Sequence, residues 1–254
     1  MRRIPNLRDW EKLAAINPML PNIARVVLRR VPGAQTLVFY GSQITGDTDQ
    51  YSDYDVLIIA PSDDVPGFRE RAEIEKVLEK QHGIKVQVAA TSPTAAWLEL
   101  RLKLYLRHWL EQGVILGDGS TFPEPLPPLA KEGARVSLGS IENDLELMIE
   151  DGDGRRSRGE VLFCALRMLL LLRAAIQGDY SVNVRRKAEE LLGTTAVRRL
   201  RNPKGRLSAD DVAHLEMQVE RLLAEVRELA AKMAENTSDE DLREQVEIYR
   251  REAA

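Results

Sequence analysis

The chain has 254 residues, of which 44% are hydrophobic and 30% are charged, and its formal net charge is −4. This balance is typical of a globular protein with a charged surface, and the length suits one large domain or two smaller ones. The acidic net charge argues against a protein that coats nucleic acid over its whole surface, so any nucleic-acid contact would have to be local.

The composition also indicates a compartment. Cys164 is the only cysteine, which excludes an internal disulfide bond and fits a reducing cytosol. No secretory signal is recognisable near the N-terminus, and the longest apolar run, 161–172, is short for a membrane span and contains Arg167. We therefore expect a soluble, cytoplasmic protein with no membrane partner. We also expect Cys164 to be buried on the apolar face of its helix.

The first part of the chain alternates between helical and extended patterns. Apolar spacing predicts helices over 22–30, 68–81 and 97–112, and β-branched or apolar runs predict strands over 36–40, 53–59 and 84–90. A short helix is expected to start near Gln43, and 113–117 is a short extended piece. The strand over 53–59 is apolar on both faces after its start, as a central strand should be. The predicted fold class is an α/β (α+β) domain with a mixed sheet.

The second part of the chain is predicted to be an all-α helical bundle. Four prolines between 123 and 128 indicate a linker, and helical spacing follows over 138–150, 159–177, 185–192 and 209–235. The polar tail, 236–254, is expected to be a loosely packed helix. The predicted organisation is a domain at 1–120, a Pro-rich linker at 121–135 and a helical domain at 136–254. Because 161–172 is apolar on nearly every face, the sequence also favours a homodimer.

The most informative pattern lies at the start of the second predicted strand. Gly41-Ser42 follows the strand over 36–40, and ten residues later comes Asp53-Tyr54-Asp55. Carboxylates two residues apart on a strand point to the same face, because side chains alternate along it. Mg²⁺ is typically held by one or two carboxylates together with substrate phosphates and water. The pattern therefore predicts a site for a metal-bound nucleotide.

This pattern, with Gly46 and Ser52 inside it, resembles the signature of the polymerase-β-like nucleotidyltransferase superfamily. The resemblance covers about the first 120 residues, an ordinary domain size. The layout of such a domain followed by helices resembles the kanamycin-type aminoglycoside nucleotidyltransferases, and also the minimal nucleotidyltransferases that pair with helical HEPN proteins.

The resemblance implies roles for individual residues. Gly41, Ser42 and Ser52 would bind the nucleotide, since a glycine lets the backbone approach phosphates and Ser42 offers a hydroxyl and an N–H at a helix start. Asp53 and Asp55 would be the catalytic residues and would hold Mg²⁺ or Mn²⁺ against the phosphates during in-line attack.

One position departs from the family pattern. Members that use two metals usually carry a third carboxylate on the next long strand, where this sequence has Gln87. Glutamine offers a carbonyl oxygen but neither a negative charge nor a base. Three alternatives stay open. An acid from the helical part could substitute, the substrate could need no base, or the protein could bind nucleotide without transferring anything. The candidate acids are Glu142, Asp144 and Glu146.

Basic residues give two further candidate contacts. Lys85 shares a strand face with Gln87 and could reach a triphosphate, although a solvent-facing lysine is the commoner case. The basic segment 185–206 could contact RNA, a phosphorylated substrate or the phosphates of the nucleotide, or it could be a solvated helix face.

Two functions are consistent with this sequence. The first is Mg²⁺-dependent transfer of a nucleoside monophosphate from a nucleoside triphosphate, with ATP as the expected donor, to a hydroxyl on a small molecule, an RNA or a protein. Pyrophosphate would be released. The second is a non-catalytic nucleotide-binding or regulatory module, similar to an antitoxin, which Gln87 favours. Base specificity, acceptor and number of metals are not readable from the residues.

Overall fold

The chain folds into two compact units. The computed structural model describes residues 2–46, 48, 52–102, 104–117, 122, 129–150, 158–179, 182–201 and 207–233. The first unit holds the described residues up to Leu100 and those between Tyr105 and Pro127. The second holds those of Arg101–Leu104 and those between Pro128 and Glu244.

The first unit is built on a mixed β-sheet. Five strands are present among the described residues: β1 (Arg2–Ile4), β2 (Thr36–Tyr40), β3 (Tyr54–Ile59), β4 (Val86–Thr91) and β5 (Val114–Gly117). Their order across the sheet is β1-β5-β2-β3-β4. β2 runs antiparallel to both of its neighbours, whereas the β1–β5 and β3–β4 pairs are parallel. The predicted mixed sheet is thus confirmed.

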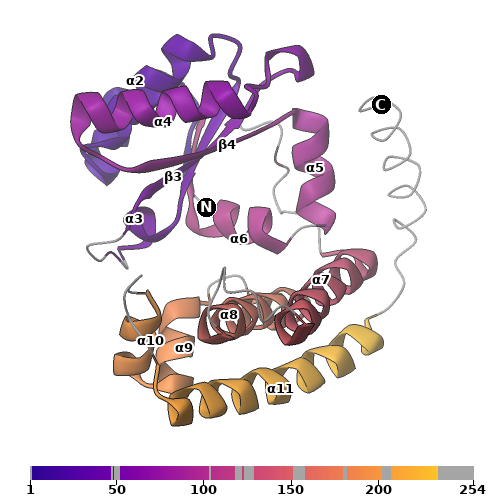
Figure 1. Ribbon diagram of the computed structural model, residues 1–254. Coiled ribbons are helices and arrows are strands. Elements are labelled where there is room, and N and C mark those ends of the chain that lie inside the picture. The colour runs from indigo at the N-terminus through magenta and orange to yellow at the C-terminus, as the bar shows by residue number, and fades with distance from the viewer. Residues whose placement is uncertain are drawn as a thin grey trace. The chain divides into compact units, whose positions relative to one another are not determined.

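Helices cover both faces of this sheet (Figure 1). One face packs against α1 (Trp10–Ile16), α2 (Leu20–Arg30) and α4 (Phe68–His82), and its buried strand residues include Phe39, Val56 and Ile58. The other face packs against α5 (Pro93–Leu102) and α6 (Leu104–Gln112), and it takes the alternate strand residues, among them Val38 and Leu57. Burial on both sides explains why the central strands are continuous apolar runs.

β4 is an edge strand, and a side chain of α4 closes part of that edge. The backbone N–H of Val88 donates to Oε1 of Glu75 at 2.8 Å. The backbone oxygens of Lys85 and Thr91 accept hydrogen bonds from the β3 side of the ladder. Backbone polar groups alternate between the two edges of a strand, and Val88 is three residues from each of these positions. Its N–H therefore points away from β3, toward the open edge of the sheet. The Glu75 carboxylate therefore accepts a hydrogen bond from a backbone N–H that no neighbouring strand pairs with.

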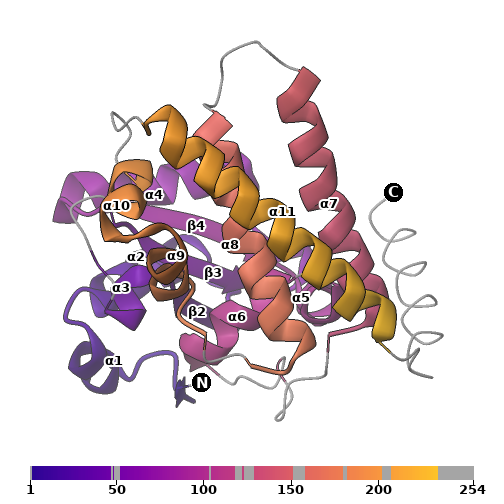
Figure 2. The same cartoon turned by 90° about the horizontal axis from the view of Figure 1, so that it is seen from below.

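The second unit is a bundle around α8 (Arg158–Ile176). α8 packs against both α7 (Lys131–Glu150) and α11 (Ala209–Lys232). Figure 2 shows α11 crossing in front of α8, with α9 (Val184–Leu192) and α10 (Thr194–Arg201) on the side of α8 away from α7. Eleven residues of α8 are buried. The apolar surface that favours a homodimer in the sequence is therefore covered within the unit itself. Cys164 is exposed, so the expectation of a buried cysteine is wrong.

Several elements differ from the prediction. β1, α1 and α10 were not predicted, and 97–112 is not one helix, because α5 begins at Pro93 and α6 at Leu104. α7 begins at Lys131, so the end of the segment 121–135 is helical rather than linker. The prolines at 123–128 and the tail 236–254 lie outside the described residues. None of the described helices combines the length and the apolar character that crossing a membrane requires.

Candidate functional site

The turn after β2 requires glycine for two reasons. Gly41 adopts φ 81° and ψ −171°, a backbone region that only glycine enters easily. A Cβ at this position would lie 2.0 Å from Oδ2 of Asp55, so a side chain would collide with that carboxylate. The absence of a side chain at Gly41 therefore lets the backbone pack against the carboxylate of Asp55. α3 (Ser42–Thr45) begins at the next residue.

The two aspartates stand at the start of β3, on the face covered by α5 and α6. Asp55 pairs with Tyr40 on β2, and Leu57, two residues further along, is buried on that same face. Since alternate residues share a face, Asp53 and Asp55 continue the line that Leu57 and Ile59 begin. Both carboxylates are half-buried. On this face of the strand, Leu57 and Ile59 lie in the core, and the two aspartates lie at its N-terminal end.

α3 is tied to the residues before β3. The Nε2 of Gln43 donates to the backbone oxygen of Ser52 at 3.2 Å. Gly46, with φ 83°, ends the helix, and its N–H donates to the backbone oxygen of Ser42 at 3.0 Å. Ser42 and Ser52 are therefore held at the same end of the strands as Asp53. Asp47 and residues 49–51 lie outside the described residues.

Gln87 lies directly beside Asp55, in the register of the β3–β4 ladder. Its side chain is exposed, and since paired residues share a face it is on the side of the sheet that carries Asp55. The backbone N–H of Tyr54 donates to the carbonyl of Lys85 at 2.9 Å, which brings Lys85 beside Asp53. Lys85 is also exposed. The amide and the ammonium thus flank the two carboxylates.

Tyr40 is a residue of this cluster that the sequence alone did not indicate. It is 5% exposed and follows Val38 on the same face of β2. Burial of the phenol, followed by the nearby carboxylates of Asp55 and Asp53, raises the pKa of Tyr40 above its usual range. The sequence signal that could have indicated Tyr40 is its position at the end of a predicted strand, directly before Gly41.

The acids on α7 that the sequence offered as a substitute base are either bonded to an arginine or exposed. Nε of Arg227 donates to Oε1 of Glu142 at 2.6 Å, while Asp144 and Glu146 are exposed on α7. Within the part of the chain that the structure describes, no three His, Cys, Asp or Glu side chains gather as a metal-binding group. Within the first unit, the described carboxylates at this end of β3 are Asp53 and Asp55.

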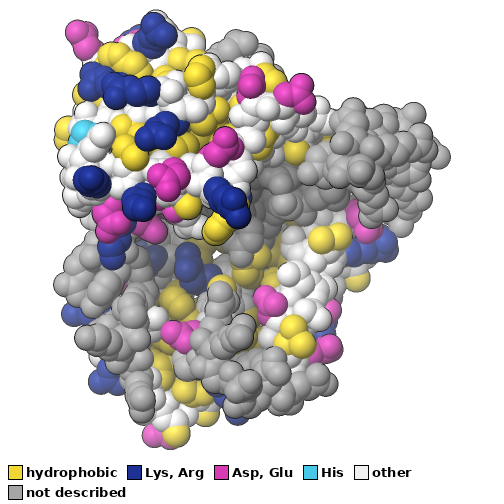
Figure 3. Space-filling view, turned by 45° about the horizontal axis from the view of Figure 1, so that its top comes forward, with side chains coloured by type: hydrophobic (Ala, Val, Ile, Leu, Met, Phe, Trp, Pro, Cys, Tyr) yellow, Lys and Arg dark blue, Asp and Glu magenta, His cyan; other side chains and the backbone are white. Residues whose placement is uncertain are grey.

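Neighbouring acids neutralise part of the charge of the basic segment 185–206. Four of its side chains form ion pairs at 2.8–3.5 Å: Arg185–Glu189, Arg186–Glu190, Lys187–Glu190 and Arg199–Asp211. Residues 202–206 lie outside the described residues. Figure 3 likewise shows Lys and Arg side chains interspersed with Asp and Glu on the visible face of the first unit. The described part of the segment 185–206 thus keeps a net positive charge, because three acids pair with four of its six basic side chains.

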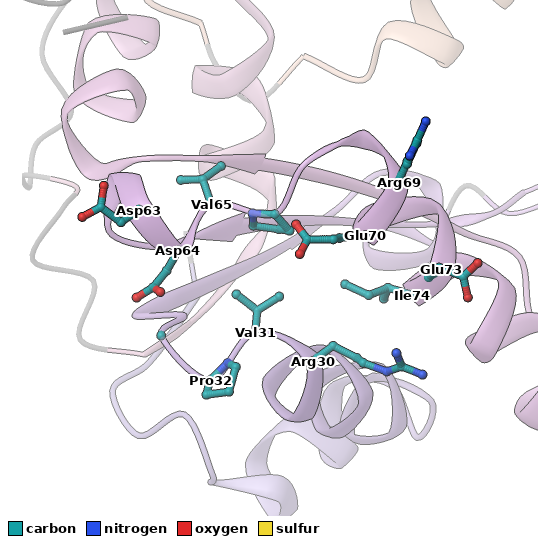
Figure 4. Close-up of a pocket in the computed structure, with 12 residues that line it drawn as sticks. Arg30, Val31, Pro32, Asp63, Asp64, Val65, Arg69, Glu70, Glu73 and Ile74 are labelled. Carbon is teal, nitrogen blue, oxygen red and sulfur yellow. The ribbon is translucent and has the colours of Figure 1, made fainter.

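A cavity of about 400 Å³ lies at the opposite end of β3 from the aspartates. Figure 4 shows Val31, Val65 and Ile74 around it, with Glu70 between Val65 and Ile74 in this view and Arg69 turned away. It adjoins Asp63 and Asp64, which follow the end of β3, whereas Asp55 is near the start. A strand of six residues spans roughly 20 Å, so this cavity is separate from the carboxylate site.

Comparison with known proteins identifies the first unit. Residues 20–116 match the family described as a nucleotidyltransferase domain. This match agrees with the resemblance to nucleotidyltransferases that the sequence implied for the first part of the chain. Nucleotidyl transfer is the class of chemistry for which that family is named. No relative is found among curated protein sequences.

Two solved structures resemble the chain. Spectinomycin adenyltransferase AAD(9) from Enterococcus faecialis, solved with ATP and spectinomycin, is 11% identical, with a TM-score of 0.50 over 83% of this chain and 98% of that one. This likeness extends the shared fold into the helical unit. A toxin–antitoxin structure with AMP-PNP is 17% identical, with a TM-score of 0.29 over 50% of this chain and 88% of that one.

Proposed function

We propose that the protein is a Mg²⁺-dependent nucleotidyltransferase that moves a nucleoside monophosphate from a nucleoside triphosphate to a hydroxyl acceptor. The observation that carries this proposal is the packing of Asp55 against Gly41 in a nucleotidyltransferase domain. It joins the turn that approaches phosphates to a carboxylate that can hold their metal.

The residues fit the metal that this function implies. Two half-buried carboxylates on one strand face provide hard oxygen ligands, and Mg²⁺ prefers such ligands with the remaining positions left to phosphate and water. Asp53 and Asp55 would hold the ion. When bound, it neutralises charge on the phosphates as pyrophosphate departs.

The chain contributes positioning and charge to the transfer step. The acceptor oxygen attacks the α-phosphorus, the bond from that phosphorus to the bridging oxygen breaks, and pyrophosphate leaves. Gly41 and Ser42 would orient the triphosphate, and Lys85 would balance part of its charge as a point cation. The proton of the acceptor hydroxyl passes to a group other than Gln87, because a neutral amide is not a base.

ATP is the donor to test first, because the similar spectinomycin adenyltransferase was solved with ATP and spectinomycin. The protein would be incubated with each labelled nucleoside triphosphate, Mg²⁺ and small-molecule, RNA or protein acceptors, and pyrophosphate release would be measured. We expect release with at least one acceptor and its loss in Asp53→Asn and Asp55→Asn. Release that persists in both variants would place the chemistry elsewhere.

A second function, nucleotide binding without transfer, is favoured by Gln87. Its exposed amide stands where the sequence resemblance places a third carboxylate, directly beside Asp55. A regulatory module of this kind would bind Mg²⁺–ATP in calorimetry and release no pyrophosphate with any acceptor. Turnover with any acceptor would reject it.

A further inference from the structure

The last residue of β2 carries a phenol that the proposed transfer does not use. Tyr40 is 5% exposed, and its ring belongs to the apolar cluster between the sheet and α5 and α6. It is also paired in register with Asp55 on the neighbouring strand, which places both side chains on one face. A buried tyrosine and the carboxylate proposed to hold the metal are therefore paired on neighbouring strands.

This phenol is not the base that Gln87 fails to supply. An ordinary phenol has a pKa of about 10, so the hydroxyl of a tyrosine is protonated at neutral pH. A protonated phenol is a hydrogen-bond donor. A buried polar group needs a partner, and a carboxylate acceptor makes a stronger bond than a neutral one.

We propose that Tyr40 is a positioning residue whose hydroxyl donates to the Asp55 carboxylate and fixes its orientation toward the metal–nucleotide. The proposal rests on the function proposed above. Oδ2 of Asp55 already packs against Gly41, so the glycine limits the carboxylate from one side. The phenol would limit its rotation from the paired strand. A carboxylate has about four acceptor positions, which leaves oxygen lone pairs for the ion.

The test compares two tyrosines on adjacent strands. Tyr40→Phe removes the hydroxyl at the site and keeps the buried ring. Tyr54→Phe removes a hydroxyl that bonds Oδ1 of Asn17 at 3.4 Å, and Tyr54 packs against the opposite face of the sheet. Mn²⁺ would be titrated into each protein with and without ATP, and free Mn²⁺ would be counted by electron paramagnetic resonance, with no acceptor present.

Loss of a partner that orients a metal ligand typically weakens metal affinity by about 10–100-fold. We expect a loss of that size in Tyr40→Phe and unchanged affinity in Tyr54→Phe, with metal-free unfolding temperatures close to that of the unsubstituted protein. Equal Mn²⁺ affinity in Tyr40→Phe and the unsubstituted protein would overturn the role of Tyr40. If the unsubstituted protein bound no Mn²⁺ even with ATP, the proposed function itself would fall.

A second measurement covers the case in which Tyr40→Phe does not fold. Tyrosine labelled with ¹³C at Cζ reports the hydrogen bonding of each phenol in the unsubstituted protein. We expect one buried tyrosine resonance to move when Mg²⁺–ATP is added and to stay in place in Asp55→Asn. A set of tyrosine resonances that are all unaffected by Mg²⁺–ATP would contradict the proposal.

Discussion

Gly41 and Asp55 occupy adjoining space, because Oδ2 of the aspartate lies 2.0 Å from the position that a Cβ on the glycine would take. Gly41 directly follows β2, Asp55 lies on β3, and the whole of α3 lies between them in the sequence. Their contact joins the turn that we propose to approach the phosphates to the strand that carries the two carboxylates. Any side chain at position 41 must therefore move Asp55.

Gly41→Ala should destabilise the protein and impair the site together. A residue other than glycine at φ 81° and ψ −171° costs about 1–3 kcal/mol of backbone strain, before the collision with Asp55 is counted. Urea unfolding would measure the free energy of unfolding, and calorimetry the binding of Mg²⁺–ATP. We expect a loss in both.

The matched control is Gly83→Ala. Gly83 has φ 65° at the end of α4, and a Cβ there would meet no atom within 4 Å. This variant should lose about 1–2 kcal/mol from its left-handed backbone alone and keep its affinity for Mg²⁺–ATP. Equal losses of stability, with binding retained in both variants, would mean that the contact with Asp55 has no role.

Asp55→Asn should fold normally and lose its response to nucleotide. The amide has nearly the same shape as the carboxylate but cannot hold the ion by charge. In the unsubstituted protein, Mg²⁺–ATP at a hundred times its dissociation constant should add about 2.7 kcal/mol of stability. Thermal unfolding with and without the ligand would show this gain absent in the variant. A preserved gain would remove Asp55 from the proposed site.

Gln87→Glu should increase transfer if a missing base limits it. The register of β3 and β4 places the new carboxylate beside Asp55. General-base catalysis typically contributes about 10²- to 10⁴-fold to a rate, so pyrophosphate release should rise by about 10²-fold or more. Gln87→Ala is the control and should leave the rate unchanged. A Gln87→Glu rate no higher than that of the control would show that the proton leaves by another route.

The pKa of Tyr40 predicts a loss of stability at high pH. Its pKa is raised above the ordinary value of 10.0 by burial first, then by Asp55 and Asp53. The folded state therefore keeps this proton where the unfolded state releases it. The stabilising effect is complete below about pH 10 and declines above it, by up to about 1.4 kcal/mol per pH unit.

The measurement is urea unfolding of the unsubstituted protein and of Tyr40→Phe between pH 8 and pH 11. Other groups titrate in this range, so the informative quantity is the difference between the two proteins. The unsubstituted protein should lose more stability than the variant as the pH rises above 10. Parallel curves would show that the phenol has the same pKa in the folded and unfolded states.

Much of the sheet was predictable because its central strands are buried on both faces. The strand over 36–40 matches β2 at both ends, since β-branched and aromatic residues stop at Gly41. The spacing of Asp53 and Asp55 fixed which face they share, and it drew attention to Gln87 one strand away. These relationships depend on local alternation, which a sequence displays directly.

Other features depend on partners far along the chain. Arg2–Ile4 is too short to show a strand pattern, and it becomes β1 by pairing with Val114–Leu116. α10 is rich in arginine, and an acid that pairs with it lies on a later helix: Arg199 forms an ion pair with Asp211 of α11. Cys164 lies among apolar residues but on the part of α8 that the neighbouring helices leave exposed. Tyr40 gained its place at the site through the register between two strands.

The carboxylate of Glu75 on the backbone of Val88 also constrains how a partner can approach this domain. An edge strand with open N–H groups recruits other strands, including those of a second copy of the chain. Here one of those donors already has a negatively charged acceptor at 2.8 Å, and an incoming strand would have to displace it. Gln87, one residue away, stays accessible to a small ligand. The domain can thus keep the border beside its carboxylates exposed without making that border a template for aggregation.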